Sequence, residues 1–183
     1  MTPEPTSSTG VVALARLLGG LTWVAERLFV TEGQWADHLG ADAAVVHLAT
    51  HSRHHGWHAG LWRDALPDSP ALDALSQVQS PAKGWSRAFD AAEALAPAPD
   101  AALLAALYRN LVPRYLVLVD DIIDSYNGPG DAHVARATRL VRADVVDDLA
   151  GGIACLHAAI ADRDDIETAA STTQMLDQAF RTC

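Results

Sequence analysis

Apolar side chains recur at the spacing of an α-helix along most of this 183-residue sequence. Between about Val11 and Trp35 they form one broad face, and the same spacing recurs over residues 101–126. Capping residues and chain breaks indicate two further helices over residues 43–65 and 132–162. Alternation of apolar and polar residues, the pattern of a half-buried strand, is not sustained over several elements. The sequence therefore predicts an all-α fold with four long helices.

Breaks rich in proline and glycine separate these helical segments. The sequence Leu66–Pro70 ends the second segment, and Asn127–Gly130 ends the third. Between these two segments, residues 71–78 and 85–95 show shorter helical patterns. We expect a ferritin-like, up-down-up-down four-helix bundle with short extra helices between helices two and three.

The predicted helices divide the chain into three regions. Residues 1–10 read as a flexible tail, residues 11–163 as the helical bundle, and residues 164–183 as a C-terminal helix or tail. Pro113 lies inside the third long helix and should kink it there, because proline has no amide hydrogen and crowds the preceding turn.

Charge and composition exclude several classes of partner. The net charge is −10, and the chain has 13 basic residues, of which only Lys83 is a lysine. The arginines are scattered, so we expect no nucleic-acid partner. We find neither a run of about 18 apolar residues nor a secretory signal, and we expect a cytoplasmic protein without a membrane partner. The two cysteines form no zinc-binding pattern.

Histidines are concentrated in the second predicted helix. Five of the eight histidines fall between His47 and His58. His47, His51, His54 and His58 follow one another at spacings of four, three and four, which places them on one stripe of a helix. Imidazole is the commonest neutral metal ligand and titrates near neutral pH. We expect function here, and we expect His55, which lies off the stripe, at the surface or an interface.

Acidic residues accompany the apolar faces of the other three long helices. A buried charge is costly unless it is paired or binds a metal, so acids and imidazoles projecting inward from four helices favour a di-iron or di-manganese site. The acids are Glu26 in the first helix, Asp120, Asp121 and Asp124 in the third, and Asp144, Asp147 and Asp148 in the fourth.

These residues resemble the motifs of the ferritin-like superfamily, the four-helix bundles that hold di-metal carboxylate sites. Ala25-Glu26-Arg27-Leu28, the stretch Thr50–Trp62 and Arg139–Asp148 carry the resemblance, which covers roughly residues 11–163. The chain is most similar to small bacterial members in which the second helix reads His-His-x-Trp-His before a Leu-Pro stop.

The family site uses a glutamate on helix one, Glu-x-x-His on helix two, a glutamate on helix three and Glu-x-x-His on helix four. Glu26 stands at the first glutamate, and His51 and His54 stand at the first Glu-x-x-His. Asp121 or Asp124 replaces the third-helix glutamate, and an Asp-x-x-Asp replaces the second Glu-x-x-His. The resemblance thus implies the metal ligands Glu26, His51, His54, Asp124, Asp144 and Asp147.

The implied cofactor is iron, as a di-iron centre, with manganese and zinc as alternatives. The implied function is a non-haem iron oxidase or oxygenase acting on a small organic substrate. His58 would be a further ligand or a catalytic proton relay, and a homodimer is one expected assembly. The alternative function is a metal-free ferritin-like bundle that acts as a binding or scaffold protein, with the histidines and acids forming a buried polar network.

Less specific interpretations apply to the individual residues. Glu26 would also be explained by an ion pair with an arginine such as Arg53 or Arg142, and Asp144 and Asp147 by a solvated face or an arginine partner. Residues 120–124 match the Asp-Asp-x-x-Asp pattern, but we favour a simple acidic helix end. A pH-sensing role of the histidine cluster would make the protein less stable between about pH 7 and 5.

Overall fold

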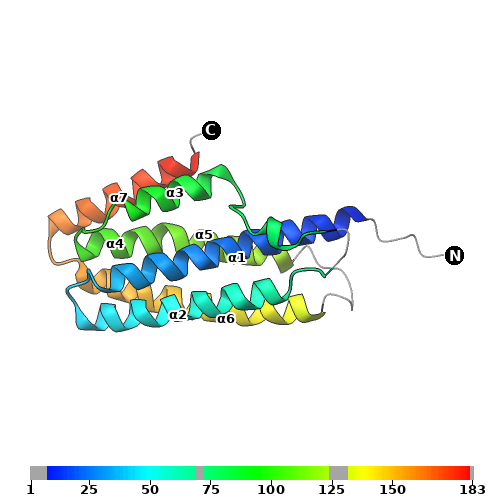
Figure 1. Ribbon diagram of the computed structural model, residues 1–183. Coiled ribbons are helices and arrows are strands. Elements are labelled where there is room, and N and C mark those ends of the chain that lie inside the picture. Colours follow the sequence, from blue (N-terminus) through cyan, green and yellow to red (C-terminus); the bar gives the residue numbers. More distant parts are fainter. Residues whose placement is uncertain (1–7, 69–71, 124–131, 182–183) are drawn as a thin grey trace.

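A computed structural model describes residues 8–68, 72–123 and 132–181 (Figure 1). Residues 1–7 of the expected tail and the predicted ligand Asp124 lie outside this part of the chain. The described chain is all-helical, as predicted. Its elements are α1 Ser8–Ala36, α2 Asp42–Asp64, the 3₁₀ turn η1 Leu75–Gln77, α3 Lys83–Glu93, α4 Asp100–Ala106, the π-helical turn η2 Leu107–Leu111, α5 Val112–Ile123, α6 Ala132–Ala159 and α7 Arg163–Arg181.

The long helices run side by side along a common axis (Figure 1). Helix α1 packs along α2, and α6 packs against both α2 and α5. Helix α7 packs against both α3 and α4, and Figure 1 shows α7 in orange to red beside the green α3. The C-terminal region, expected as a helix or tail, is thus a 19-residue helix packed on the domain.

The continuous helix α4–η2–α5 lies at the centre of the domain. It is long and apolar enough to cross a membrane, but most of its apolar stretch is buried against the other helices, as in the core helix of a globular protein. Tyr108 and Tyr115 of this helix are almost fully buried, together with Trp35 of α1 and Trp62 of α2. The indole nitrogen of Trp62 donates a 2.8 Å hydrogen bond to the Tyr115 hydroxyl, so these large side chains are buried without an unpaired polar group on either.

The sequence predicted a kink at Pro113, and the structure has a π-helical turn, Leu107–Leu111, that ends two residues before this proline. In a regular α-helix the amide of residue 113 would donate to the carbonyl of Arg109, and proline has no amide hydrogen to donate. The wider turn from Leu107 to Leu111 contains one residue more than an α-turn, so it changes the direction in which the adjacent side chains point.

Two adjacent glycines let α6 approach the other helices closely. A Cβ atom on Gly152 would lie 2.2 Å from the ring of Tyr108, and one on Gly151 would lie 2.3 Å from the ring of His47. Both distances are far below van der Waals contact. Side chains of α2 and of the central helix therefore pack directly against the backbone of α6.

We predict that Gly152→Ala lowers the free energy of unfolding by about 2 kcal/mol or more, because the added methyl group forces the buried Tyr108 ring to move. Gly60 in α2 is the matched control, since a Cβ there meets nothing within 4 Å. Gly60→Ala should leave stability unchanged or raise it by up to about 1 kcal/mol through its higher helix propensity. Urea unfolding followed by circular dichroism measures both, and equal effects would contradict this packing.

Candidate functional site: a buried network of histidines and carboxylates

The core-facing side of α2 carries three buried histidines. His51, His55 and His58 are at most 2% exposed, whereas His47 and His54 are partly exposed. The expectation of a surface or interface position for His55 was therefore wrong. Residues 51, 55, 58 and 62 also follow spacings of four, three and four. They form a second stripe on α2 beside the predicted stripe from His47 to His58, and the structure buries much of both stripes.

His55 pairs with Glu32 of α1, and both side chains are fully buried. The Nδ1 atom of His55 lies 2.8 Å from Oε2 of Glu32. Burial by itself would lower the pKa of His55, but the charge of Glu32 and its hydrogen bond outweigh burial and raise that pKa. Glu32 thus favours the protonated form of this buried imidazole, whereas burial opposes it.

Asp148 of α6 joins two histidines of α2. Its carboxylate lies 3.0 Å from Nε2 of His51 and 2.9 Å from Nδ1 of His54. Burial would raise the pKa of Asp148, yet the hydrogen bonds and charges of the two histidines lower it. Asp148 therefore accepts hydrogen bonds from both rings as a carboxylate.

The hydroxyl of Tyr108 extends this chain of hydrogen bonds into the core. It lies 2.8 Å from Nδ1 of His51, and burial raises its pKa well above the ordinary value. A protonated Tyr108 donates to Nδ1 of His51, and Nε2–H of His51 donates to Asp148. The series Tyr108, His51, Asp148 and His54 runs from the centre of the domain to the half-exposed ring of His54.

His58 forms a third contact between α2 and a carboxylate. Its Nε2 atom lies 3.2 Å from Oδ2 of Asp144 of α6, and the His58 side chain is fully buried, whereas that of Asp144 is 35% exposed. Burial, followed by repulsion from His55, lowers the pKa of His58 to about 4. His58 is therefore neutral at physiological pH.

The structure brings together some of the predicted site residues and leaves others apart. His51, His54, His58 and Asp144 all belong to the buried network. Glu26 is not part of it, because its carboxylate pairs with Arg63 on the outer side of α1 and α2. Asp147 is exposed. Of the other predicted acids, Asp120 pairs with Arg142 through a 2.7 Å contact.

Sequence reasoning missed three residues of the network, which are Glu32, His55 and Tyr108, and left Asp148 out of the proposed ligands. The spacing of α1 contains a signal for Glu32: residues 21, 25, 28, 32 and 35 form one helical stripe, and the other four are buried apolar residues. Glu26 is out of phase with that stripe. A carboxylate in phase with core residues was therefore the better candidate for a buried acid.

Several polar atoms of the network have no hydrogen-bond partner. They include Oε1 of Glu32, Nε2 of His55 and Nδ1 of His58, all buried. The rings of His55 and His58 lie 5.6 Å apart, centroid to centroid, and are nearly perpendicular. Within the described residues, however, no three or more His, Cys, Asp or Glu side chains are grouped so that they would hold a metal ion as they stand.

Comparison with known proteins finds no relative for this chain: no family model, no curated protein and no solved structure matches it.

We predict that Glu32→Gln lowers the free energy of unfolding by about 3 kcal/mol, because it leaves the buried His55 without its counter-charge. Glu26→Gln provides a control on the same helix. Its ion pair with Arg63 is partly exposed, so its loss should change stability by less than about 1 kcal/mol. Urea unfolding at pH 7 measures both variants. A loss of unfolding free energy in Glu32→Gln no larger than that in Glu26→Gln would contradict the importance of the pair formed by Glu32 and His55.

The lowered pKa of His58 predicts a specific loss of stability in acid. The unfolded chain binds a proton at His58 near pH 6.5, whereas the folded protein binds it only near pH 4. Stability from this group therefore falls as the pH drops between these values, by at most about 1.4 kcal/mol per pH unit, or about 3 kcal/mol in all. The raised pKa of His55 has the opposite effect on stability, because the folded protein binds a proton at His55 more tightly than the unfolded chain does.

His58→Asn isolates this contribution, because it removes one titrating group and keeps a polar side chain. Between pH 7 and 4.5, its unfolding free energy should fall less steeply than that of the unchanged protein. His133→Asn, an exposed histidine at the start of α6, should leave the slope unchanged. Equal slopes in the His58→Asn variant and the unchanged protein would contradict the prediction.

Proposed function

We propose that this protein is a ferritin-like four-helix-bundle metalloprotein that uses non-haem iron in an oxidase or oxygenase reaction on a small organic substrate. The buried imidazoles of His55 and His58 would hold the metal. The proposal of a metal rests on the geometry of these two rings, whereas the choice of iron and of oxygen chemistry rests on the resemblance of the sequence to ferritin-like proteins.

The observation that carries the proposal is the state of the two ring nitrogens of each histidine. His55 contacts Glu32 through Nδ1, and His58 contacts Asp144 through Nε2. The remaining nitrogen of each ring is buried without a partner. Histidines that bind metals commonly donate their other N–H group to a carboxylate, which fixes the orientation of the ring.

The separation of the two rings also fits a shared ion. With metal–nitrogen distances of about 2.0 Å, two imidazoles on one metal have ring centres roughly 5 Å apart. The centroids of His55 and His58 lie 5.6 Å apart, which is close to that separation. Two imidazoles leave coordination positions open for oxygen ligands and for substrate.

Bound ferrous iron would supply the activation of dioxygen. The protein's own contribution would be orientation and proton transfer. Glu32 and Asp144 would orient the two imidazoles, and the hydrogen-bonded series from Tyr108 through His51 and Asp148 to His54 would connect the interior with solvent. His54 is suited to the outer end of that series, since 39% of its side chain is exposed.

A second candidate function is a metal-free bundle that acts as a binding or scaffold protein. It is favoured by the pairing of each buried imidazole with a carboxylate and by the lack of a ready group of three ligands among the described residues. In that case the network would serve to fix how α1, α2 and α6 are rotated against one another.

Metal analysis separates the two functions. We predict that protein purified without a histidine tag, loaded anaerobically with ferrous iron and desalted, retains about one iron or more per chain and unfolds at a higher temperature than the unloaded protein. His58→Gln should lose the iron and the thermal shift, while His133→Gln should keep both. Circular dichroism confirms that each variant is folded before loading.

The results of iron loading decide between the metalloprotein and the metal-free bundle. Iron that is lost only with His58 supports the metalloprotein and justifies a search for oxygen consumption with organic substrates. Failure of the unchanged protein to retain iron, manganese or zinc would reject it in favour of the metal-free bundle. Retention of metal by a folded His58→Gln variant would place any metal elsewhere and also reject the proposed site.

A further inference from the structure

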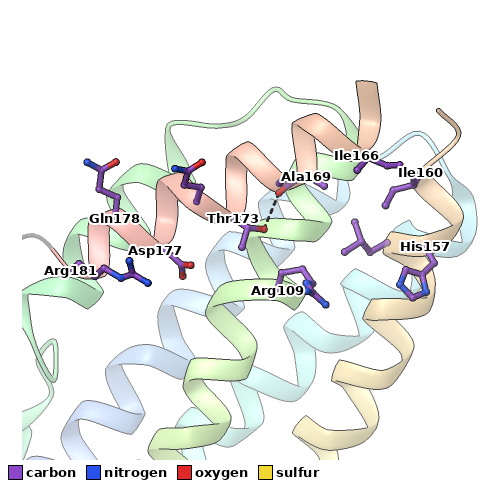
Figure 2. A pocket seen from close by; sticks show the side chains of 12 residues that line it. Arg109, His157, Ile160, Ile166, Ala169, Thr173, Asp177, Gln178 and Arg181 are labelled. Atoms are coloured by element: carbon purple, nitrogen blue, oxygen red, sulfur yellow. Dashed lines mark hydrogen bonds between the residues drawn. The ribbon is translucent and has the colours of Figure 1, made fainter. Parts of the chain in front are cut away.

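A cleft of about 890 Å³ lies on the side of the domain where α6 ends, between α6, the π-helical turn η2 and α7 (Figure 2). None of the histidines or carboxylates of the buried network lines it. Its volume falls in the range of pockets that bind small molecules, roughly 300–1,000 Å³. The cleft therefore needs an explanation of its own, independent of the proposed metal site.

Apolar side chains from two helices form one wall of the cleft. Leu156 and Ile160 come from the end of α6 and the residue after it, and Ile166 and Ala169 come from the first turns of α7. Figure 2 shows Ile160 and Ile166 facing each other across the junction of the two helices. This wall is suited to a hydrocarbon chain or ring.

Arg109 reaches the cleft from the otherwise buried central helix. Every residue from Ala101 to Val112 is buried except Arg109. The π-helical turn directs Tyr108 and Asn110 into the protein and Arg109 outward, so the helix meets solvent at one charged residue, and that residue lines the cleft (Figure 2). A pocket with an apolar wall and a few convergent polar groups is typical of a ligand site.

The charge balance of the cleft favours an anionic ligand. Arg109 has no hydrogen-bonding or ionic partner among the described residues. Asp177 is the one carboxylate in the described lining, and its Oδ1 atom is already bonded at 2.8 Å by both Asn110 and Arg114. The guanidinium of Arg109 is thus available to pair with a ligand. Within the described chain it is an unpaired positive charge, on a protein whose net charge is −10.

We propose that this cleft binds an apolar molecule that ends in a single carboxylate. The carboxylate would pair with Arg109, whose planar guanidinium can donate two parallel hydrogen bonds to it. The apolar part would lie on Leu156, Ile160, Ile166 and Ala169. The site requires no metal, so it stands whether or not the buried histidines bind iron.

Octanoate is a suitable probe for the proposed site. Isothermal titration should give saturable binding of octanoate to the full chain, with acetate, octanol and octylamine each at least about tenfold weaker, since each lacks either the chain or the negative charge. Amide chemical shifts in NMR spectra should change around η2, the end of α6 and α7. Octyl phosphate tests whether a carboxylate is preferred over another anion on the same chain.

Two variants test the assignment of residues. Arg109→Gln should weaken octanoate binding at least tenfold, whereas Arg139→Gln, an exposed arginine of α6 outside the cleft, should not change it. Ala170→Trp adds bulk at an exposed position that lines the cleft, so it should block binding without disturbing the core. Circular dichroism confirms that the variants are folded.

The proposal is overturned if octanoate does not bind saturably at millimolar concentration, or if Arg109→Gln and Ala170→Trp bind it as well as the unchanged protein. Tighter binding of octanol than of octanoate would show that the cleft is apolar but not selective for anions. Tighter binding of octyl phosphate would replace the carboxylate by a phosphate monoester. Loss of binding in both cleft variants, with shifts confined to the cleft, supports it.

Discussion

The contact on which the centre of this structure depends is the fully buried pair formed by Glu32 and His55. Burying either group without the other would be unfavourable, because removing a charged side chain from water costs several kcal/mol. The pair therefore forms only when α1 and α2 adopt the rotation and axial position that bring these two side chains together. Apolar packing between the helices is less selective, since leucines and alanines tolerate many small shifts.

The same constraint extends from α2 to α6. Asp148 receives hydrogen bonds from His51 and His54, and Asp144 contacts His58, so three imidazoles of α2 are tied to two carboxylates one turn apart. Gly151 and Gly152 let His47 of α2 and Tyr108 of the central helix pack directly against the backbone of α6. Polar contacts of defined geometry thus set how the helices are paired, whichever of the two proposed functions applies.

The all-helical class and the positions of the helices were predictable from the sequence, and the network only in part. Helical periodicity and breaks at proline and glycine locate the helices to within a few residues, because these signals are local. Which acid meets which histidine depends on the rotation of each helix, which is not local. Glu26 and Glu32 are nearly two turns apart on α1, and only the phase of Glu32 with the buried stripe distinguishes the paired acid from the exposed one.

The π-helical turn places two adjacent side chains in different surroundings. In η2 the adjacent residues Tyr108 and Arg109 point to opposite sides: the tyrosine bonds to His51 in the core, and the arginine lines the outer cleft. Pro113 removes the hydrogen bond that would favour a regular helix at this point. A wider turn in the most buried helix therefore places a neutral donor against the histidine network and a cation against solvent. Because the two side chains are adjacent in the sequence, any movement of η2 caused by a ligand at Arg109 would act directly on the hydrogen bond between Tyr108 and His51.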